Sequence, residues 1–228
     1  MSQHAENVDT WDSIEGEESM GEGHEPAWHA LISYVQEKSL ADKNILDFGC
    51  NRGRFLKVLH QALPYRSALG VDIAEESIAF ANAHKGDTPC DYEHSRVLAE
   101  KKDAFDIAFS HEVVYLLPDI VAHAREIGSV LKKGGVYYLA IGEYAENPLW
   151  ERWKETVAEF SPVPPQTYSL QDIAKAFQDN GFSVSIRRMV TDGFLPYDAS
   201  DGKYLQSPME LLDFMTQYMM LFRLVKTA

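Results

Sequence analysis

The residues best suited to chemistry are two acids and two glycines in the first third of the sequence. Asp47, Gly49 and Gly53 fall in the stretch ILDFGCNRGRF, and Asp72 ends the stretch SALGVD. Each acid follows a short apolar run that is typical of a buried strand. An acid at the end of a second strand, roughly 20 residues beyond a glycine-rich turn, can accept hydrogen bonds from ribose hydroxyls. We therefore expect a ligand that resembles a nucleoside.

The residues of the glycine loop indicate which nucleoside-containing ligands it does not suit. Gly49 and Gly53 remove side chains where the backbone must pass close to a neighbour, and a helix that begins near Gly53 offers free backbone N–H groups. The loop lacks the third glycine of the dinucleotide pattern G-x-G-x-x-G, and no G-K-[ST] follows it. A nicotinamide-dependent dehydrogenase is therefore disfavoured.

Five stretches, in their order and spacing, resemble the class I S-adenosylmethionine-dependent methyltransferases. LDFGCNRGRF resembles motif I of that family, L-D-x-G-C-G-x-G, and LGVDIAEESIAFAN resembles motif II. FDIAFSHEVVYLLPD and LKKGGVYYLA are similar to its fourth and fifth strands, and YSLQDIAKAFQDNGFSVS is similar to its late helix and sixth strand. The resemblance covers roughly residues 27–190. It implies S-adenosylmethionine as the cofactor and S-adenosylhomocysteine as the product.

The resemblance also implies a role for individual residues. Asp47 and Gly49 would border the aminopropyl end of the cofactor, with its amine attracted to the carboxylate. Asp72 would hold the ribose, and Ile73 would pack on the adenine. The end of the fourth strand would face the methionyl and sulfonium part. The expected cofactor-binding residues are Asp47, Gly49, Cys50, Asn51, Gly53, Asp72, Ile73, Ser110 and His111. The adenine amine would be bound by the backbone alone or by one of Glu93, His94 and Ser95.

Asn51 departs from the family motif, which has a glycine at this position. If the position requires positive φ, asparagine is the least costly substitute, because its short polar side chain tolerates the left-handed region. We therefore expect cofactor binding to be retained. The alternative is a repacked loop, in which case the protein would be a non-catalytic S-adenosylmethionine-binding module or would have lost the cofactor.

Methyl transfer from a sulfonium is an in-line displacement, in which correct alignment can supply ~7–11 kcal/mol. A base is needed only if the acceptor must lose a proton; His111 is the candidate, with Glu112 beside it as an acid more typical of a helix start. Aromatic faces attract cationic groups, so aromatic residues are candidates for acceptor binding, although core packing is the alternative. These candidates are Trp11, Tyr115, Tyr144 and Trp150.

The elements that must position these residues alternate along the chain. The patterns predict strands near residues 44–48, 67–73, 90–95, 105–110, 135–142, 182–190 and 219–227. They predict helices near residues 26–38, 53–62, 74–84, 118–131, 147–160, 169–181 and 208–217. Such alternation indicates a parallel sheet with helices on both faces. With the resemblance, we expect an α/β, Rossmann-like, doubly wound sheet of seven strands, mostly parallel, with an antiparallel last strand.

Charge and composition limit the acceptor. The 228 residues carry a net charge of −14, whereas nucleic-acid-binding proteins usually show a basic surface. Residues 1–27 contain eight acids and no Lys or Arg, so residues 1–26 are either a solvated tail or a lid. His24 and His29, in or near this segment, are expected at the surface. Residues 27–228 would form the methyltransferase domain, with residues 143–168 and 191–218 as insertions that build the acceptor pocket.

We therefore expect a small-molecule methyl acceptor. The alternative within the fold, a tRNA or protein methyltransferase, would need a local basic surface. No apolar run reaches the ~20 residues that span a bilayer, the N-terminus shows no secretory signal, and only two cysteines occur, which predicts a cytoplasmic protein without membrane contact. No Cys/His cluster has metal spacing, so no metal is expected. The apolar stripe in residues 209–218 leaves a monomer and a homodimer both open.

Overall fold

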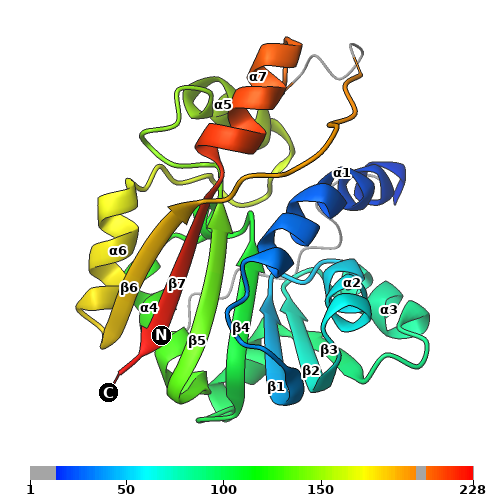
Figure 1. Ribbon diagram of the computed structural model, residues 1–228, viewed down its shortest axis with the longest axis vertical. Coiled ribbons are helices and arrows are strands. Elements are labelled where there is room, and N and C mark those ends of the chain that lie inside the picture. Colours follow the sequence, from blue (N-terminus) through cyan, green and yellow to red (C-terminus); the bar gives the residue numbers. More distant parts are fainter. Residues whose placement is uncertain (1–13, 199–203, 228) are drawn as a thin grey trace.

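A seven-stranded mixed sheet lies at the centre of the molecule (Figure 1). The structure is a computed structural model, and it describes residues 14–198 and 204–227. The strand order is β3-β2-β1-β4-β5-β7-β6, and β7 runs antiparallel to both of its neighbours while the other pairs are parallel. This confirms the predicted fold class.

The strands lie close to the predicted ranges. They are β1 Leu40–Phe48, β2 Tyr65–Asp72, β3 Cys90–His94, β4 Phe105–His111, β5 Leu131–Ile141, β6 Phe182–Arg188 and β7 Met220–Lys226. Three begin earlier than predicted: β2 by two residues, and β1 and β5 by four residues, in these two cases before a register irregularity. In β1 the irregularity lies between Leu40 and Asn44, and in β5 Leu131 already pairs with Phe105. The KKGG stretch, which follows the end of the preceding helix, is therefore a distorted part of β5, with Gly134 at φ 76°.

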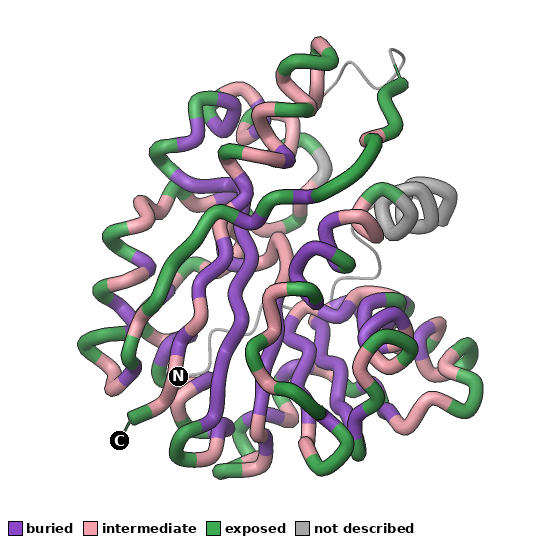
Figure 2. The backbone as a smooth tube through the Cα atoms, in the orientation of Figure 1, coloured by how far each residue is buried: buried purple, intermediate pink, exposed green. Residues whose placement is uncertain are grey.

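The helices cover both faces of the sheet. They are α1 Ile14–Ser33, α2 Arg54–Ala62, α3 Glu75–His84, α4 Ile120–Val130, α5 Trp150–Phe160, α6 Leu170–Gln178 and α7 Pro208–Asp213. Short helical turns add η1 Ser95–Glu100, η2 Val114–Leu116 and η4 Phe214–Tyr218. Buried side chains of α1, α2 and α3 share one core with one face of the sheet, and those of α4 and α6 share the core of the other face. Figure 2 shows the sheet between them as a mostly buried layer.

Capping residues explain where several helices begin. The Ser169 hydroxyl accepts from the N–H of Asp172, and the Asp172 carboxylate accepts from the N–H of Ser169, so the two residues form a capping box at the start of α6. Asp119 caps α4 by accepting from two backbone N–H groups at 2.9 Å, so α4 begins after Pro118 and not at it. The prediction for α1 was wrong at its start. Pro26, expected to open this helix, lies inside it, and the acidic segment before Pro26 is helical from Ile14.

The carboxyl ends of β1, β2, β4 and β5 lie side by side at one end of the sheet, with α1 beside them (Figure 1). Glu25 of α1 forms an ion pair with Arg54 at the start of α2, with 2.6 Å between the charged atoms. Within the described residues, no helix has the length and apolar character needed to cross a bilayer. The parts of the chain that carry the predicted site are thus brought to one end of the sheet.

Candidate active site

The loop after β1 has a left-handed backbone at three of its five residues. The φ angles are 80° at Gly49, 44° at Asn51 and 76° at Gly53. The N–H groups of Gly49 and Cys50 both donate to the carbonyl of Val71, at 2.8 and 3.0 Å, which fixes the loop against the end of β2. The structure therefore gives Asn51 the positive φ for which asparagine is suited.

The two glycines make room for side chains of the protein itself. A Cβ atom at Gly49 would lie 2.3 Å from a methyl group of Val113, and one at Gly53 would lie 2.4 Å from the ring of Tyr92. The Tyr92 hydroxyl donates to the carbonyl of Gly53 at 2.8 Å. The expected close approach is present, and its neighbours are two residues that the sequence did not single out. Both are separated from the loop by tens of residues, so no local pattern could reveal them.

Asp72 organises the turn between β2 and α3. Its Oδ1 accepts from the N–H groups of Ile73 and Ala74, at 2.7 and 3.0 Å, and its Oδ2 accepts from the N–H of Asn51 at 2.8 Å. The residue is only 5% exposed. An ionised carboxylate can accept several hydrogen bonds at once, and Asp72 uses both of its oxygens. Asp72 thus connects the loops after β1 and β2 and places Ile73 beside the loop of Asn51.

Asp47 is a buried acid without a partner among the described residues. The residue is 3% exposed, and its Oδ2 is shielded from solvent and forms no hydrogen bond. Burial, reinforced by the negative charge of Asp72, raises the pKa of Asp47 to about 8. A second shielded acceptor without a partner, Oδ1 of Asn51, lies in the neighbouring loop. Buried acceptors are normally hydrogen-bonded or paired with a cation, so these two atoms fit a ligand that carries donors and a positive charge.

Ser110 and His111, at the end of β4, point to opposite faces of the sheet. The Ser110 hydroxyl hydrogen-bonds the Tyr137 hydroxyl at 2.6 Å. The Tyr137 hydroxyl also contacts Nε2 of His123 at 3.0 Å. The Ser110 side chain therefore belongs to the buried network beneath α4, which leaves its backbone to border the site. His111 faces α1 instead.

His111 is covered by two residues of α1. Its ring centroid lies 5.1 Å from that of His24 and 6.3 Å from that of Trp28, with the rings packed edge to face. Its Nε2 is shielded and has no hydrogen-bond partner in the part of the chain that the structure describes, and burial lowers the pKa of His111 well below the usual value for histidine. Burial likewise lowers the pKa of His24 to about 4. Both rings are therefore neutral at pH 7. His24, expected at the surface, is half-buried against His111, whereas His29 is exposed.

A pair of carboxyl groups lies at the ends of β4 and β5. Glu112 follows β4 with φ 58°, and its N–H donates to Ala140 at 3.1 Å; Glu143 follows β5 and is 9% exposed. The two side chains hydrogen-bond each other, and burial raises the pKa of both. Burial and both carboxyls also raise the pKa of Tyr115. The sequence suggested a helix start for Glu112, and nothing local pointed to Glu143.

The predicted acceptor-binding aromatics separate into different surroundings. Trp150 is fully buried and donates to the Thr167 hydroxyl at 3.1 Å, and Tyr144 is 2% exposed within the core. Both side chains are therefore part of the packed interior. Tyr115 packs edge-on against Trp150 with 5.4 Å between centroids and lies beside the carboxyl pair. Trp11 lies outside the described residues.

The residues considered for the adenine amine lie at the end of β3 and the start of η1. Glu93 is exposed on the edge strand, Ser95 is 3% exposed, and Nδ1 of His94 accepts from the N–H of Arg96 at 3.2 Å. The structure does not favour one of the three. Among the described residues, no group of three or more His, Cys, Asp and Glu side chains is arranged to hold a metal ion.

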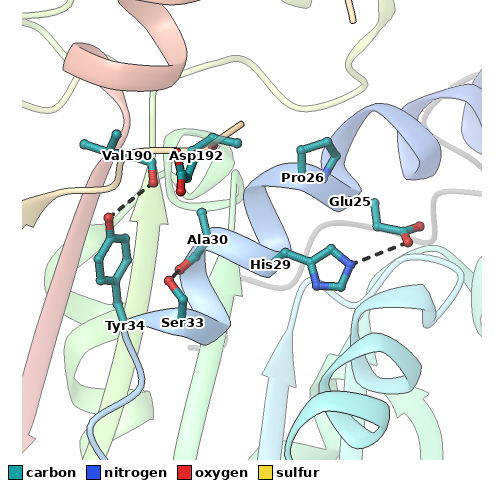
Figure 3. A pocket seen from close by; sticks show the side chains of 9 residues that line it. Glu25, Pro26, His29, Ala30, Ser33, Tyr34, Val190 and Asp192 are labelled. Carbon is teal, nitrogen blue, oxygen red and sulfur yellow. Dashed lines mark hydrogen bonds and ion pairs between the residues drawn. The ribbon is translucent and has the colours of Figure 1, made fainter. Parts of the chain in front are cut away.

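A separate shallow groove runs between the outer side of α1 and residues 190–192 (Figure 3). Its lining includes His29, which is paired with Glu25, and Tyr34, whose hydroxyl donates to the carbonyl of Val190 at 3.2 Å. None of the residues in the loops after β1, β2 and β4 contributes to it. This groove is therefore distinct from the candidate site.

Comparison with known proteins gives the fold and the site a family context. The sequence model of the family described as "Methyltransferase domain" matches residues 20–185. The ubiquinone biosynthesis O-methyltransferase of Pseudomonas entomophila is 28% identical over 117 residues, which cover 48% of this chain and 49% of that protein. The juvenile hormone acid O-methyltransferase of Bombyx mori is 26% identical over 184 residues, covering 73% and 66%. The chain thus spans about half the length of the first of these relatives.

Solved structures share the fold at lower sequence identity. The methyltransferase solved in complex with the Haloferax volcanii Trm112 methyltransferase activator has a TM-score of 0.80 and 19% identity, with 98% of both chains covered. The geranyl diphosphate C-methyltransferase of Streptomyces coelicolor A3(2), solved with S-adenosyl-L-homocysteine, has a TM-score of 0.65 and 17% identity, with 87% of this chain and 74% of that chain covered. At this identity the likeness concerns the fold alone.

Proposed function

The chain belongs to the methyltransferase domain family of S-adenosylmethionine-dependent enzymes, and on this premise we propose that it moves a methyl group to a small-molecule acceptor by in-line displacement. The observation that carries the proposal is Asp47, a buried carboxyl at the end of β1 without a partner among the described residues. S-adenosylmethionine has an ammonium group on its methionine part and ribose hydroxyls on its adenosine part. Asp47 and Asp72 offer acceptors for these two parts.

The residues of the two loops fit this cofactor in type and charge. Oδ2 of Asp47 accepts the ammonium group, because a buried carboxylate is stabilised by a cation that replaces lost hydration. Asp72, oriented by three backbone N–H groups, accepts from the ribose hydroxyls. When bound, the cofactor supplies an electrophilic methyl group on a sulfonium.

The remaining residues of the site align the reactants and exclude water. Displacement at a methyl group requires the attacking atom to lie opposite the departing sulfur, so positioning dominates the rate. His111 is neutral and covered by His24 and Trp28, which makes this side of the site apolar. A neutral His111 can accept a proton from an acceptor or orient it through Nε2.

The size and charge of the acceptor are inferred from the surface and the relatives. A net charge of −14 disfavours binding to nucleic acid, and the relatives named above are called methyltransferases of small molecules. Trp153 of α5 and Phe214 of η4 pack edge to face near the end of β5, with 4.8 Å between their ring centroids, and can form a wall for a small apolar group. A tRNA or protein acceptor would instead require a local basic surface.

A protein partner is a second, separate proposal. The solved methyltransferase in complex with an activator is similar to this chain over 98% of both lengths. We propose that this protein can also associate with a small activating subunit. Co-expression with a Trm112-type protein, followed by size-exclusion chromatography, should give a single complex; separate elution of the two proteins would contradict the proposal.

Calorimetric titration with S-adenosylmethionine and S-adenosylhomocysteine tests the cofactor assignment. Both compounds should bind the wild-type protein, and Asp47→Asn should weaken both because the amide cannot neutralise an ammonium. The isosteric exchange at exposed Asp91, Asp91→Asn, is the matched control and should leave binding unchanged. Turnover of a panel of small acceptors then separates an enzyme from a binding module. Absence of binding by both compounds would contradict the proposed function.

A further inference from the structure

The carboxyl pair of Glu112 and Glu143 is placed to meet an acceptor. Both residues follow strands whose carboxyl ends border the site, and β4 and β5 are neighbours with His111 opposite Ala140. The loop that carries Glu143 is held by Asn147, which is 1% exposed and donates to the carbonyl of Gly142 at 2.7 Å. The pair is therefore set on rigid backbone rather than on a free surface.

The pair lacks a compensating positive charge. Two carboxyl groups in hydrogen-bond contact do not both ionise readily, so one of them stays protonated when the other carries a negative charge. Within the described residues, neither carboxyl forms an ion pair with lysine, arginine or histidine. Oε1 of Glu112 is shielded from solvent and has no hydrogen-bond partner there. Buried charges in proteins are normally paired, so this arrangement is complete only with a cation.

Aromatic rings stand beside the two carboxyls. Tyr115 lies close enough for the charges of Glu112 and Glu143 to raise its pKa, and a Cβ atom at Gly142, the residue before Glu143, would lie 2.5 Å from the Phe214 ring. Aromatic faces and carboxylates together form a preferred environment for ammonium groups. The sulfonium of the cofactor is also a cation, but the proposed binding residues of the cofactor are Asp47 and Asp72, at the ends of β1 and β2. The carboxyl pair at the ends of β4 and β5 therefore suits a different cation.

We propose that Glu112 and Glu143 bind the methyl acceptor as a protonated amine and take the proton that its nitrogen must lose before methylation. This inference rests on the proposed function and names its substrate class. A pair that holds one proton can still accept a second one, so it can act as the base for the ammonium group of the acceptor.

The step balances in protons and electrons. The ammonium group of the acceptor gives one proton to the ionised member of the pair, which leaves a neutral amine and a fully protonated pair. The nitrogen lone pair forms the new N–C bond while the S–C bond breaks, and the electrons of that bond stay on sulfur as S-adenosylhomocysteine forms. The product leaves as a methylated ammonium ion, and the pair returns one proton to water.

The same charge argues against an anionic acceptor. A carboxylate or a diphosphate beside this pair would place like charges together in a buried site, which costs several kcal/mol. The Bombyx mori relative is named for an acid and the Streptomyces coelicolor structure for a diphosphate. We therefore expect the acceptor of this chain to differ in charge from both.

The test compares acceptors that share a skeleton and differ in one group. Phenethylamine, phenethyl alcohol and hydrocinnamate form one series, and hexylamine, hexanol and hexanoate form another. Release of S-adenosylhomocysteine should be at least about tenfold faster with the amine of a series than with its alcohol or acid. Faster turnover of an alcohol or an acid overturns the inference, as does binding of S-adenosylmethionine without methylation of either amine. Failure to bind S-adenosylmethionine would instead overturn the proposed function.

Variants of the pair test its role directly. Glu112→Gln and Glu143→Gln should each lower amine methylation about a hundredfold or more while leaving the affinity for S-adenosylmethionine unchanged. Glu151→Gln, on the exposed first turn of α5, is the matched control and should keep full activity. The infrared absorption of protonated carboxyls at neutral pH should lose intensity in both variants of the pair, while the part that disappears in Asp47→Asn should remain, and this readout does not depend on turnover. Full amine methylation by either variant would contradict the proposal.

Discussion

The backbone N–H of Asn51 donates a hydrogen bond to Oδ2 of Asp72 across 2.8 Å, and this bond joins the loop after β1 to the end of β2. The two segments carry the two halves of the cofactor motif, and each would otherwise leave unpaired polar groups at the end of the sheet. The same carboxylate also accepts from Ile73 and Ala74. Asp72 is therefore both a structural connection and a candidate ligand for ribose.

Removal of this carboxylate should affect stability and binding together. Asp72→Ala leaves three backbone N–H groups without their acceptor, so we expect the free energy of unfolding to fall by about 1–3 kcal/mol. The affinity for S-adenosylmethionine should fall by a similar free energy, because the ribose hydroxyls lose their acceptor. Denaturant titration and calorimetry measure the two effects. Asp91→Ala, at an exposed position on β3, is the control and should leave cofactor affinity unchanged. Unchanged cofactor affinity in Asp72→Ala would refute the assignment of Asp72 to the ribose.

Glycine should replace Asn51 without loss. Asn51 has φ 44°, a region that glycine occupies freely, so Asn51→Gly should leave the stability of the free protein equal or higher by up to about 1 kcal/mol. Cofactor affinity should stay equal or improve. Asn51→Ala, which keeps the strained φ without the polar side chain, should be less stable than both. A large loss of affinity in Asn51→Gly alone would mean that the shielded Oδ1 contacts the ligand.

The raised pKa of Asp47 predicts a pH dependence of cofactor binding. Asp47 titrates near pH 8 in the free protein, so below this pH it is protonated and must release a proton to pair with an ammonium group. The affinity for S-adenosylmethionine should therefore rise with pH up to about pH 8, by at most tenfold per unit. Calorimetry in buffers of different ionisation enthalpy should detect the released proton. Asp47→Asn should abolish both effects, and a pH-independent affinity in the wild type would contradict the assignment.

The same shift predicts the effect of Asp47 on the stability of the free protein. The folded-state pKa of about 8 lies above the ordinary value of 3.8, so the folded state binds more protons than the unfolded state between these values. The contribution of Asp47 to stability is therefore most favourable below pH 3.8 and declines as the pH rises to about 8. Asp47→Asn should remove this decline, which denaturant titrations at several pH values can measure against the wild type. An equal slope in both proteins would contradict the shift.

The contact between Gly49 and Val113 can be tested by a double-mutant cycle. In Gly49→Ala the new methyl group would lie 2.3 Å from Val113, and the residue would keep φ 80°, so we expect a loss of stability of about 1–3 kcal/mol or more. Val113→Ala removes the clash but not the backbone strain. The double variant should therefore recover part of the loss, and thermal unfolding of the four proteins gives the coupling. Strict additivity of the two losses would contradict the contact.

The sheet and the loops of the site were predictable because their signals are local. The runs that end at Asp47 and Asp72 are apolar and short, and the acids and glycines that follow them stand at fixed spacing. The partners that shape the site were not predictable in this way. Tyr92 and Val113 contact the glycine loop only because β3 and β4 lie beside it in the folded sheet.

Two further differences have similar causes. Glu112 looks like an acid at a helix start, and only its neighbour Glu143, 31 positions further on, gives it a chemical context. The start of α1 was misjudged because Pro26 is a common first residue of helices, whereas here the helix continues through it. The local pattern was therefore insufficient both for the role of Glu112, which depends on a distant residue, and for the start of α1.

The ion pair between Glu25 and Arg54 has a consequence for how firmly α1 is held at different salt concentrations. Both side chains are partly exposed, 34% and 43%, so dissolved ions compete with this attachment of α1 to α2. His24 and Trp28 belong to the same helix and cover His111. Higher ionic strength should therefore weaken the attachment of the helix that covers His111, whereas the buried hydrogen bonds of Asp72 are screened much less.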